Sequence, residues 1–346
     1  MSARQPYHSV PVKDVVVETA DAVSLVLAVP PELEGAFAYR PGQFLTVRVP
    51  HADGGSVARC YSLSSTPGID EHLKITVKRV VDGHASNWIC DTLTPGAVLD
   101  VLPPAGLFTP STVDGDLLLL AGGSGITPVM SILKAALAGG TGHLALVYAN
   151  RDAGSVIFRD ELQRLETRHP DRLRVVHWFD AAQGPPTAAG LGPVLRLYAD
   201  RDVYICGPEA FLTVARAALS DLSVPGRRIH VERFSSLLEN PFEPVAPVEA
   251  AGGTDHTAEV TIDGQTHTLP WPAKKRLLDV IIDAGLNPPY SCRQGICGAC
   301  ACRILDGEVE LVNNEVLEEE DFADGYTLAC QALPVTGTVT VTYSPE

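Results

Sequence analysis

Residues 289–302 have the sequence Pro-Tyr-Ser-Cys292-Arg-Gln-Gly-Ile-Cys297-Gly-Ala-Cys300-Ala-Cys302, and one more cysteine follows at Cys330. Three cysteines spaced C-x4-C-x2-C with a distant fourth are typical of the ligands of a [2Fe–2S] cluster. A loop that closes around a cluster must turn tightly, and the glycines and alanines between these cysteines permit such turns. The pattern therefore predicts a metal site made by Cys292, Cys297, Cys300 and Cys330.

Two other interpretations of these cysteines remain open at this point. Structural zinc usually takes its cysteines as two short C-x2–4-C pairs, whereas here a triplet is followed by a lone Cys330. Unrelated buried thiols are the second alternative. Cys302, two residues beyond Cys300, is expected to be a packed thiol rather than a ligand.

The chain has 346 residues, a length that predicts two or three domains. Its N-terminal residues have no apolar core of a signal peptide, and the longest aliphatic run, 117–121, is far too short to span a bilayer. We therefore expect a cytoplasmic protein that does not contact a membrane. Eight cysteines without a secretory signal favour reduced thiols over a disulfide framework.

The formal net charge is −16, and residues 257–346 alone contain 14 acidic against 5 basic side chains. Such acidity argues against nucleic acid as a partner. The run Glu318-Glu319-Glu320-Asp321 can be a solvated face, or it can steer a basic redox partner towards the cluster.

Changes in composition divide the chain into four parts. Residues 1–110 alternate apolar and polar positions between Pro-Gly and Asp-Gly turns, which predicts an antiparallel β-barrel. Residues 111–239 alternate strands with helices, which predicts an α/β domain with a parallel sheet. Residues 240–256 are rich in Pro, Ala and Gly and are interpreted as a linker. Residues 257–346 combine strands, one helix and the cysteine loop.

Two glycine turns in the α/β part point to a nucleotide site. The buried strand 116–121 runs into Gly122-Gly123-Ser124-Gly125-Ile126-Thr127-Pro128, with Pro128 expected as the first helical residue. Glycines let the backbone approach a pyrophosphate at a helix N-terminus. A second strand ends in Cys206-Gly207-Pro208. Both turns are expected at the carboxyl edge of the sheet, where ligands of open α/β sheets bind.

Two segments of the barrel part carry groups suited to a flavin nucleotide. Arg59-Cys60-Tyr61-Ser62 offers a guanidinium for phosphate, a ring for stacking and a hydroxyl donor. The second segment, 78–88, joins Lys78 to a turn at Gly83 and to Ala85, with Ser86 or Asn87 as the expected helix cap. Taken alone, the first is an ordinary strand and the second a capped turn.

In this order the motifs resemble the ferredoxin–NAD(P)⁺ reductase family with a C-terminal plant-type ferredoxin domain. Arg59-x-Tyr61-Ser62 matches the flavin motif, and the turns at 122–128 and 206–208 match the two nucleotide turns. The runs 56–65, 84–88 and 148–152 are most similar to reductase components of 3-ketosteroid 9α-hydroxylases. The resemblance implies a multi-domain fold: an antiparallel β-barrel that binds FAD, a Rossmann-like α/β domain that binds NADH, and a β-grasp (α+β) ferredoxin domain.

The resemblance also implies roles for individual residues. Arg59 would contact the flavin pyrophosphate, Tyr61 would stack on the isoalloxazine and Ser62 would lie near N5. The segment from Gly83 to Asn87 would surround the diphosphate. Cofactor-binding residues are expected at Arg59, Tyr61, Ser62, Lys78, Gly83, Ala85, Ser86, Asn87, Gly122, Gly123, Gly125, Thr127, Pro128, Cys206, Gly207, Pro208 and Phe234. Ser62, Cys206 and Glu232 are the expected catalytic residues.

We therefore expect an oxidoreductase that passes electrons from NADH through FAD and a [2Fe–2S] cluster to a terminal Rieske-type oxygenase. Asp152, close after a nucleotide-domain strand, favours NADH because it suits a free ribose 2′-hydroxyl. The chain has no Cys-x-His pair for a Rieske centre of its own, so oxidation of the substrate would occur on a partner protein. A reductase for a di-iron monooxygenase or for the phenylacetyl-CoA epoxidase would share every motif, and a non-catalytic redox sensor is the alternative from another class.

Overall fold

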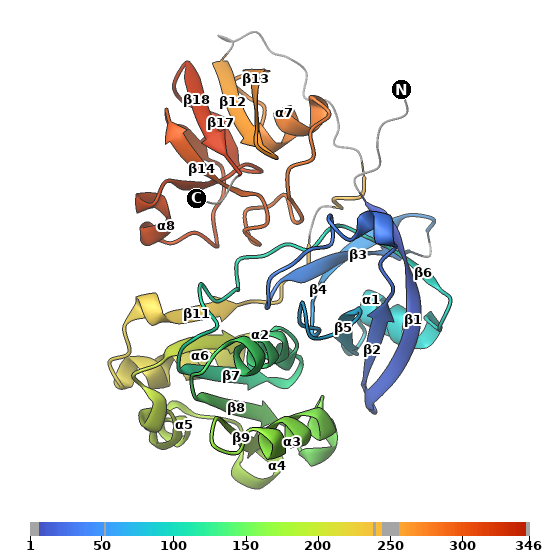
Figure 1. Cartoon of the computed structure of the whole chain (residues 1–346), viewed down its shortest axis with the longest axis vertical. Coiled ribbons are helices and arrows are strands. Elements are labelled where there is room, and N and C mark those ends of the chain that lie inside the picture. The colour runs from blue at the N-terminus through green and yellow to red at the C-terminus, as the bar shows by residue number, and fades with distance from the viewer. Residues whose placement is uncertain (1–6, 52, 238–239, 244–255, 344–346) are drawn as a thin grey trace.

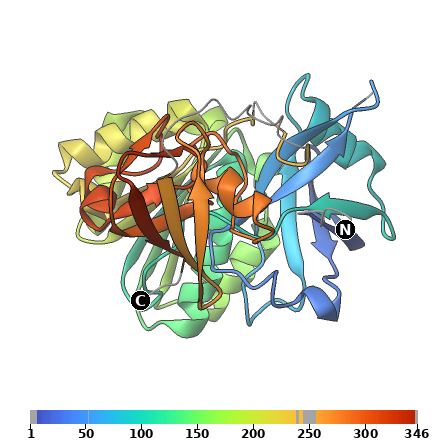
Figure 2. The same ribbon diagram turned by 90° about the horizontal axis from the view of Figure 1, so that it is seen from above.

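The chain folds as three sheet-based domains that meet at one place (Figure 1). The structure is a computed structural model that describes residues 7–51, 53–237, 240–243 and 256–343. The barrel and the nucleotide domain lie side by side, and the ferredoxin domain sits above them where they meet, as both views of the ribbon show (Figures 1 and 2). The multi-domain architecture predicted from the sequence is confirmed.

The first domain is an antiparallel six-stranded sheet in the order β4-β3-β6-β1-β2-β5. A bridge between Leu63 and Ile75 joins the two ends of the sheet and closes it towards a barrel. Alternate residues point inwards, so that Val10, Leu25 and Val47 are fully buried in its core. Its elements are β1 (His8–Thr19), β2 (Ala22–Leu27), η1 (Pro31–Leu33), β3 (Phe44–Pro50), β4 (Ser56–Ser62), β5 (Leu73–Lys78), α1 (His84–Thr92) and β6 (Val98–Val101).

The second domain is a parallel five-stranded sheet in the order β11-β10-β7-β8-β9. Helices cover both faces, and alternate residues of β7 pack on either side of the sheet, which explains its unbroken apolar run. Its elements are β7 (Leu117–Gly122), η2 (Gly123–Gly125), α2 (Ile126–Gly139), β8 (Leu144–Asn150), η3 (Ala153–Ser155), α3 (Arg159–Arg168), β9 (Leu173–Phe179), α4 (Asp180–Gln183), α5 (Ala188–Leu195), η4 (Arg196–Tyr198), β10 (Asp202–Cys206), α6 (Glu209–Asp221), η5 (Gly226–Arg228) and β11 (Ile229–Glu232).

One expected boundary in this domain was wrong. Helix α2 begins at Ile126, so Pro128 is its third residue and not its first. The glycines before it form a 3₁₀ turn whose carbonyls accept from the Ile126 N–H, and this turn leads directly into the helix. Proline is tolerated anywhere in the first turn because the N–H it lacks has no intrahelical partner there.

The third domain is a mixed sheet in the order β13-β12-β18-β14-β16, with β12 and β18 parallel and the other pairs antiparallel. Helix α7 packs on the sheet through Leu277, Leu278 and Ile281. Its elements are β12 (His256–Ile262), β13 (Gln265–Trp271), α7 (Leu277–Asp283), β14 (Ala301–Asp306), β15 (Val309–Leu311), α8 (Glu319–Ala323), β16 (Tyr326–Leu328), β17 (Ala332–Pro334) and β18 (Thr338–Thr342).

The barrel and the nucleotide domain are fastened by buried polar contacts. Lys134 of α2 is only 5% exposed, and its Nζ lies 2.7 Å from Asp70 Oδ2 of a barrel loop and 3.3 Å from Glu161 of α3. Beside it, the Ser131 hydroxyl donates to the Ser65 carbonyl at 2.6 Å. These contacts fix how the carboxyl edge of the parallel sheet faces the barrel.

The expected linker, 240–256, falls partly outside the described residues, which omit 244–255. Its first residues are held in place. Asn240 donates to the Ser56 carbonyl at 2.8 Å, and Phe242 packs edge-on against Tyr7. The linker therefore starts from a fixed point on the barrel, and His256 already belongs to β12.

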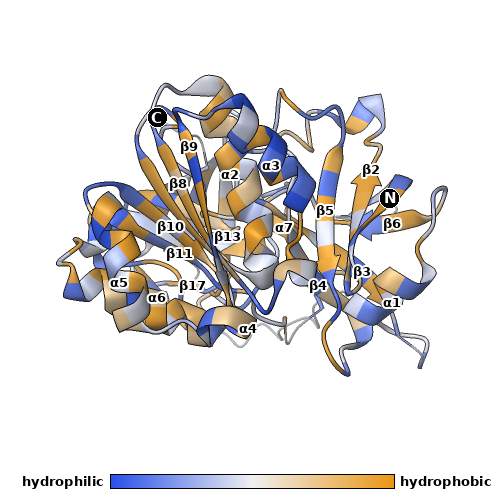
Figure 3. Ribbon diagram, turned by 90° about the horizontal axis from the view of Figure 1, so that it is seen from below, coloured by the Kyte–Doolittle hydropathy of each residue, from blue (hydrophilic) through white to orange (hydrophobic). Residues whose placement is uncertain are grey.

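Hydrophobic residues concentrate in the strands of the nucleotide sheet, while the helices that flank it have mixed faces (Figure 3). Within the part of the chain that the structure describes, every helix is too short or too polar to cross a bilayer. The cytoplasmic location stays a prediction.

Candidate functional site

Strand β4 presents the expected flavin motif at the edge of the barrel sheet, paired with β3. Arg59 and Tyr61 share one face of the strand because side chains alternate. Arg59 Nη1 donates to the Ala58 carbonyl at 2.7 Å, and Tyr61 packs against the barrel core, where burial raises its pKa. Ser62 ends the strand and is 4% exposed. A cation, a ring and a hydroxyl thus follow one another along a few residues, as a flavin nucleotide requires.

The N-terminus of α1 forms the second part of the expected flavin site. The cap is Gly83, so the expectation of Ser86 or Asn87 as cap was wrong. Both side chains instead tie the preceding turn to the helix: Ser86 Oγ accepts from the Val80 N–H at 3.0 Å, and Asn87 Nδ2 donates to the Gly83 carbonyl at 2.7 Å. A Cβ on Gly83 would lie 2.8 Å from Val80 Cβ, which explains the glycine. With Ala85 nearly buried, the exposed backbone of this turn is the part that suits a diphosphate.

The two glycine turns of the nucleotide domain touch one another. A Cβ on Gly125 would lie 2.1 Å from the Cys206 carbonyl oxygen, and one on Gly207 would lie 3.1 Å from Gly122 Cα. Only glycine permits this approach. The hydroxyl of Thr127, which is 2% exposed, donates to the Ser124 carbonyl at 3.1 Å and holds the first turn. These turns fit a pyrophosphate because they offer helix N-termini without side chains in the way.

Pro208 caps α6 and completes the second turn. Its neighbour Cys206 is fully buried, and burial raises the pKa of the thiol well above its ordinary value. A nicotinamide ring could reach this sulfur only after neighbouring residues move. Its expected cofactor-binding and catalytic roles therefore stay predictions.

Lys78 is the last residue of β5 in the barrel and lies close to the first glycine turn of the nucleotide domain. Its Nζ is 3.8 Å from Asp21 Oδ2 and 3.8 Å from the position that a Cβ of Gly123 would take. The backbone φ of Gly123 is +53°, in the left-handed region. The cation thus reaches across the domain boundary. Arg151 reaches the same carboxylate at 2.8 Å from the nucleotide side.

Asp152, expected to favour NADH, has a structural role of its own. Its carboxylate accepts from the Ser155 N–H at 2.9 Å and caps the short helix η3. A capping role alone accounts for an aspartate at this position. The preference for NADH therefore stays a prediction.

The four expected cluster ligands come together in the ferredoxin domain. Cys292 and Cys297 are joined directly, since the backbone N of Cys292 lies 3.5 Å from Cys297 Sγ. Backbone N–H groups point at the sulfurs: Gln294 N lies 3.3 Å from Cys292 Sγ and Cys330 N lies 3.4 Å from Cys300 Sγ. Donors of this kind stabilise thiolate charge and tune cluster potentials. The four sulfurs thus fit a [2Fe–2S] cluster, while Cys302 is buried in the domain core as expected of a packed thiol.

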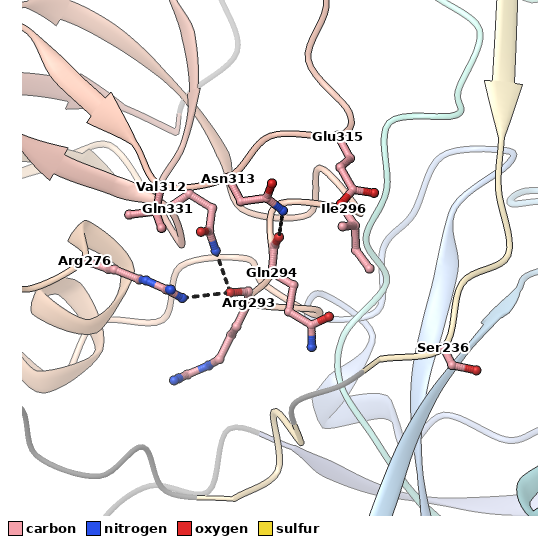
Figure 4. A pocket seen from close by; sticks show the side chains of 9 residues that line it. All are labelled: Ser236, Arg276, Arg293, Gln294, Ile296, Val312, Asn313, Glu315 and Gln331. Atoms are coloured by element: carbon pink, nitrogen blue, oxygen red, sulfur yellow. Dashed lines mark hydrogen bonds between the residues drawn. The ribbon is translucent and has the colours of Figure 1, made fainter.

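A cavity of about 420 Å³ adjoins the cluster loop (Figure 4). Dashed lines in the figure mark how its lining holds the loop backbone: Arg276 and Gln331 donate to the Arg293 carbonyl at 3.1 and 2.7 Å, and Asn313 donates to the Gln294 carbonyl at 2.8 Å. Arg293 itself has a φ of +58° and pairs with Asp279 at 3.2 Å. Side-chain donors thus fix an irregular loop that has no sheet partner of its own.

A second, narrow cavity of about 30 Å³ lies where all three domains meet. The expected catalytic pair Ser62 and Glu232 lines it together with Cys297 of the cluster loop. The complete lining is Phe44, Cys60, Ser62, Glu232, Arg233, Phe234, Ser235, Leu237, Ile296 and Cys297. We call this place the three-domain junction. The three-domain junction is lined by the flavin motif, the end of the nucleotide sheet and the cluster loop. Electron transfer between bound centres needs such an arrangement.

Glu232 provides the carboxyl group among the residues that line the junction. It ends β11 opposite Cys206, and desolvation raises its pKa to about 8. Phe234, two residues on, is 49% exposed and lines the same cavity. Near neutral pH the carboxyl is thus largely protonated and can hold a proton beside Ser62.

Three family models match the chain in the order of these domains. They are an oxidoreductase FAD-binding domain over residues 9–109, an oxidoreductase NAD-binding domain over 119–217, and a 2Fe-2S iron-sulfur cluster binding domain over 260–335. A 3-ketosteroid-9-alpha-monooxygenase ferredoxin reductase component from Rhodococcus rhodochrous is 51% identical over 94% of this chain and 93% of its own length. The chain belongs to the ferredoxin reductase components of monooxygenase systems. It is an oxidoreductase that uses FAD, NAD and a [2Fe–2S] cluster.

Two further matches span all three domains. One component of the 1,2-phenylacetyl-CoA epoxidase of Escherichia coli is 33% identical over 98% of both chains. The solved structure of phthalate dioxygenase reductase has the same fold, with a TM-score of 0.56 and 24% identity over 97% of this chain and 98% of that one. A ferredoxin reductase component implies an oxygenase partner that receives the electrons.

The motifs did not reveal which residues join the domains. Phe44, Ala105 and Ala299 form a small apolar group between the barrel and the cluster loop, and a Cβ on Gly298 would lie 2.5 Å from Leu107. Leu107 is 48% exposed, and Phe44 stands at the start of a strand. Nothing in the sequence distinguishes these two residues from ordinary core residues.

We predict that Gly125→Ala disrupts the nucleotide site. The added methyl group overlaps the Cys206 carbonyl, and overpacking of this kind costs about 1–3 kcal/mol. We expect a lower melting temperature and NADH binding weakened by about tenfold or more, the equivalent of ~1.4 kcal/mol, measured by titration of flavin absorbance. Gly115→Ala, where nothing lies within 4 Å of the added Cβ, is the matched control and should behave like the wild type. Equal NADH affinity in both variants would contradict the assignment.

Replacement of Cys300 should remove the cluster, whereas replacement of Cys302 should not. Both side chains are almost fully buried, at 3% and 2% exposure, so Cys302→Ala controls for the loss of packing. Cys300→Ala should lower bound iron from about two per chain to well below one and abolish the electron paramagnetic resonance signal of the reduced cluster. A full iron content in Cys300→Ala would overturn the ligand set.

Glu232 should make the stability of the protein depend on pH. Its pKa is higher in the folded chain than the 4.5 of the free group, so the folded state binds more protons between about pH 5 and pH 8. The free energy of unfolding that depends on Glu232 should therefore fall as the pH rises through this window and level off above about pH 8. The melting temperature of Glu232→Gln relative to wild type should rise across it.

The matched control for this prediction is Glu310→Gln, because Glu310 is exposed on β15 and forms no ion pair with any other described residue. The difference in melting temperature between this variant and wild type should stay constant with pH. A constant difference for Glu232→Gln as well would show that the carboxyl is not held protonated in the folded protein.

Proposed function

We propose that this chain transfers electrons from NADH, through FAD and the [2Fe–2S] cluster, to the terminal oxygenase of a 3-ketosteroid 9α-monooxygenase system. The observation that carries the electron route is the three-domain junction, where Ser62, Glu232 and Cys297 line one cavity. The 51% identity to the Rhodococcus rhodochrous reductase component over nearly the whole chain supports the steroid system as partner.

Each domain then has a distinct task. The turns at Gly122–Gly125 and Cys206–Pro208 would bind the NADH pyrophosphate, and Lys78 would add a cation where the nucleotide crosses to the barrel. Arg59 and the N-terminus of α1 would bind the FAD diphosphate, with Tyr61 against the ring system. When bound, FAD supplies the chemistry by which two electrons arrive together as hydride and leave one at a time for a [2Fe–2S] cluster.

The residues of the junction would position the reacting groups and manage the proton. The Ser62 hydroxyl would donate towards flavin N5, and Glu232, held largely protonated by burial, would hold a proton on its carboxyl oxygen close by. The side chains of Phe234 and Leu237 would limit the access of water to the junction. Exclusion of water suppresses side reactions at the junction.

The epoxidase system is the second candidate partner, because the matching component of the Escherichia coli enzyme aligns over 98% of both chains. Its identity, 33%, is clearly lower than the 51% of the steroid reductase component. The two candidates share the electron route and differ only in the protein that receives the electrons.

Reconstitution with purified oxygenases would decide between these partners. The holoprotein is mixed with NADH and either the oxygenase component of a 3-ketosteroid 9α-monooxygenase or that of a phenylacetyl-CoA epoxidase. Product is measured together with NADH consumption. We expect product formation per NADH to be about tenfold higher with the steroid oxygenase, a preference equivalent to ~1.4 kcal/mol. A preference for the epoxidase oxygenase, or equal coupling to both, would contradict the proposed partner.

A further inference from the structure

Cys60 occupies the variable position inside the flavin motif and lines the three-domain junction together with Ser62. Arg59 and Tyr61 share one face of β4, so Cys60 lies on the opposite face of the same strand. There it packs against both the core of the ferredoxin domain and the small apolar group Phe44, Ala105 and Ala299. Strand β4 thus carries Arg59 and Tyr61 on one face and contacts the ferredoxin domain with the other.

On that opposite face three side chains form a hydrogen-bonded contact across the domain boundary. Thr46 Oγ1 of β3 lies 2.6 Å from Ser291 Oγ of the ferredoxin domain. Cys60 Sγ lies 3.6 Å from each of these oxygens, within the range of a sulfur hydrogen bond. Thr46 and Ser291 are both 1% exposed. We call these three residues the Thr46–Cys60–Ser291 contact.

One residue of this contact is next to a cluster ligand in the sequence, so the contact can affect the position of the cluster. Ser291 directly precedes the expected ligand Cys292, and Thr46 pairs with Cys60 across β3 and β4 in register. The apolar surfaces around it favour association but do not fix its register, because the hydrophobic effect is not directional. A buried hydroxyl without a partner is costly, so the paired hydroxyls favour one arrangement of the two domains.

We infer that Thr46, Cys60 and Ser291 are positioning residues that hold the cluster loop at the distance from β4 at which the flavin-to-cluster electron transfer occurs. The rate of electron transfer between two centres falls steeply with their separation, so a small displacement of the loop slows this step. The contact itself is neither oxidised nor reduced: each electron that leaves the flavin is the one that reduces the cluster. This inference rests on the proposed function.

Rapid mixing of the anaerobic holoprotein with NADH separates the two steps, because flavin bleaching and cluster reduction have different visible spectra. Thr46→Val removes the hydroxyl from the barrel side and leaves the cluster loop unchanged in sequence. We expect flavin reduction to stay within about twofold of wild type and cluster reduction to slow by about tenfold, the equivalent of ~1.4 kcal/mol. Thr46→Ser keeps the hydroxyl and should restore the second phase. Ser291→Ala, which removes the opposite hydroxyl, should reproduce the effect of Thr46→Val.

Reactivity of the Cys60 thiol reports the contact independently of electron transfer. In the oxidised holoprotein, alkylation by iodoacetamide followed by mass spectrometry should modify Cys60 about tenfold faster in Thr46→Val than in wild type, the equivalent of ~1.4 kcal/mol. Cys90, a half-buried thiol elsewhere in the barrel domain, is the internal control and should react equally in both proteins.

The outcomes separate this inference from the proposed function. Unchanged cluster reduction and unchanged Cys60 reactivity in Thr46→Val would overturn the positioning role while the electron route stands. Slowing of the second phase in Thr46→Ser to the same extent as in Thr46→Val would also overturn it, because the hydroxyl would then not matter. Failure of NADH to reduce the flavin in the wild type would instead overturn the proposed function and the inference with it.

Discussion

Direct contact between the three domains at the three-domain junction is the constraint on which the rest of this structure depends. The barrel contributes Ser62, the parallel sheet contributes Glu232, and the ferredoxin domain contributes Cys297 to the same narrow cavity. The core clusters cross the domain boundaries: Ala58 and Leu102 of the barrel pack with the core of the ferredoxin domain, and Phe108 packs with that of the nucleotide domain. Electrons can pass from a hydride donor to a one-electron acceptor only where the three domains meet. The contacts between the domains therefore matter as much as the motifs within them.

Close approach of the cluster loop to the barrel makes this meeting possible. A Cβ on Gly298 would lie 2.5 Å from the Leu107 side chain, so only glycine permits this approach. Charged groups then fix the relative orientation of the domains: Lys134 bridges Asp70 and Glu161 between the barrel and the nucleotide domain, and Asp21 accepts both Lys78 and Arg151. The raised pKa of Glu232 is a consequence of the same assembly, because its desolvation arises at the three-domain junction.

Local sequence patterns predicted the three folds and most of their elements, since alternation, β-α order and cysteine spacing each reflect contacts within a few residues. They failed where the competing possibilities differ little in energy. The start of α2 at Ile126 and the cap of α1 at Gly83 depend on turn geometry that composition does not determine. The Thr46–Ser291 hydrogen bond joins residues 245 positions apart, so no local sequence pattern can predict it. The roles of Cys206 and Phe234 stay predictions for the same reason, because they depend on how ligands and domains meet.

An anaerobic titration of the holoprotein with NADH, followed by visible absorption and low-temperature electron paramagnetic resonance, tests the central claim most directly. We predict that about three electrons, or about 1.5 equivalents of NADH, bleach the flavin and produce the signal of a reduced [2Fe–2S] cluster in the same molecules. Flavin bleaching after about one equivalent of NADH, with the cluster still oxidised, would contradict the claim that the junction connects the two centres.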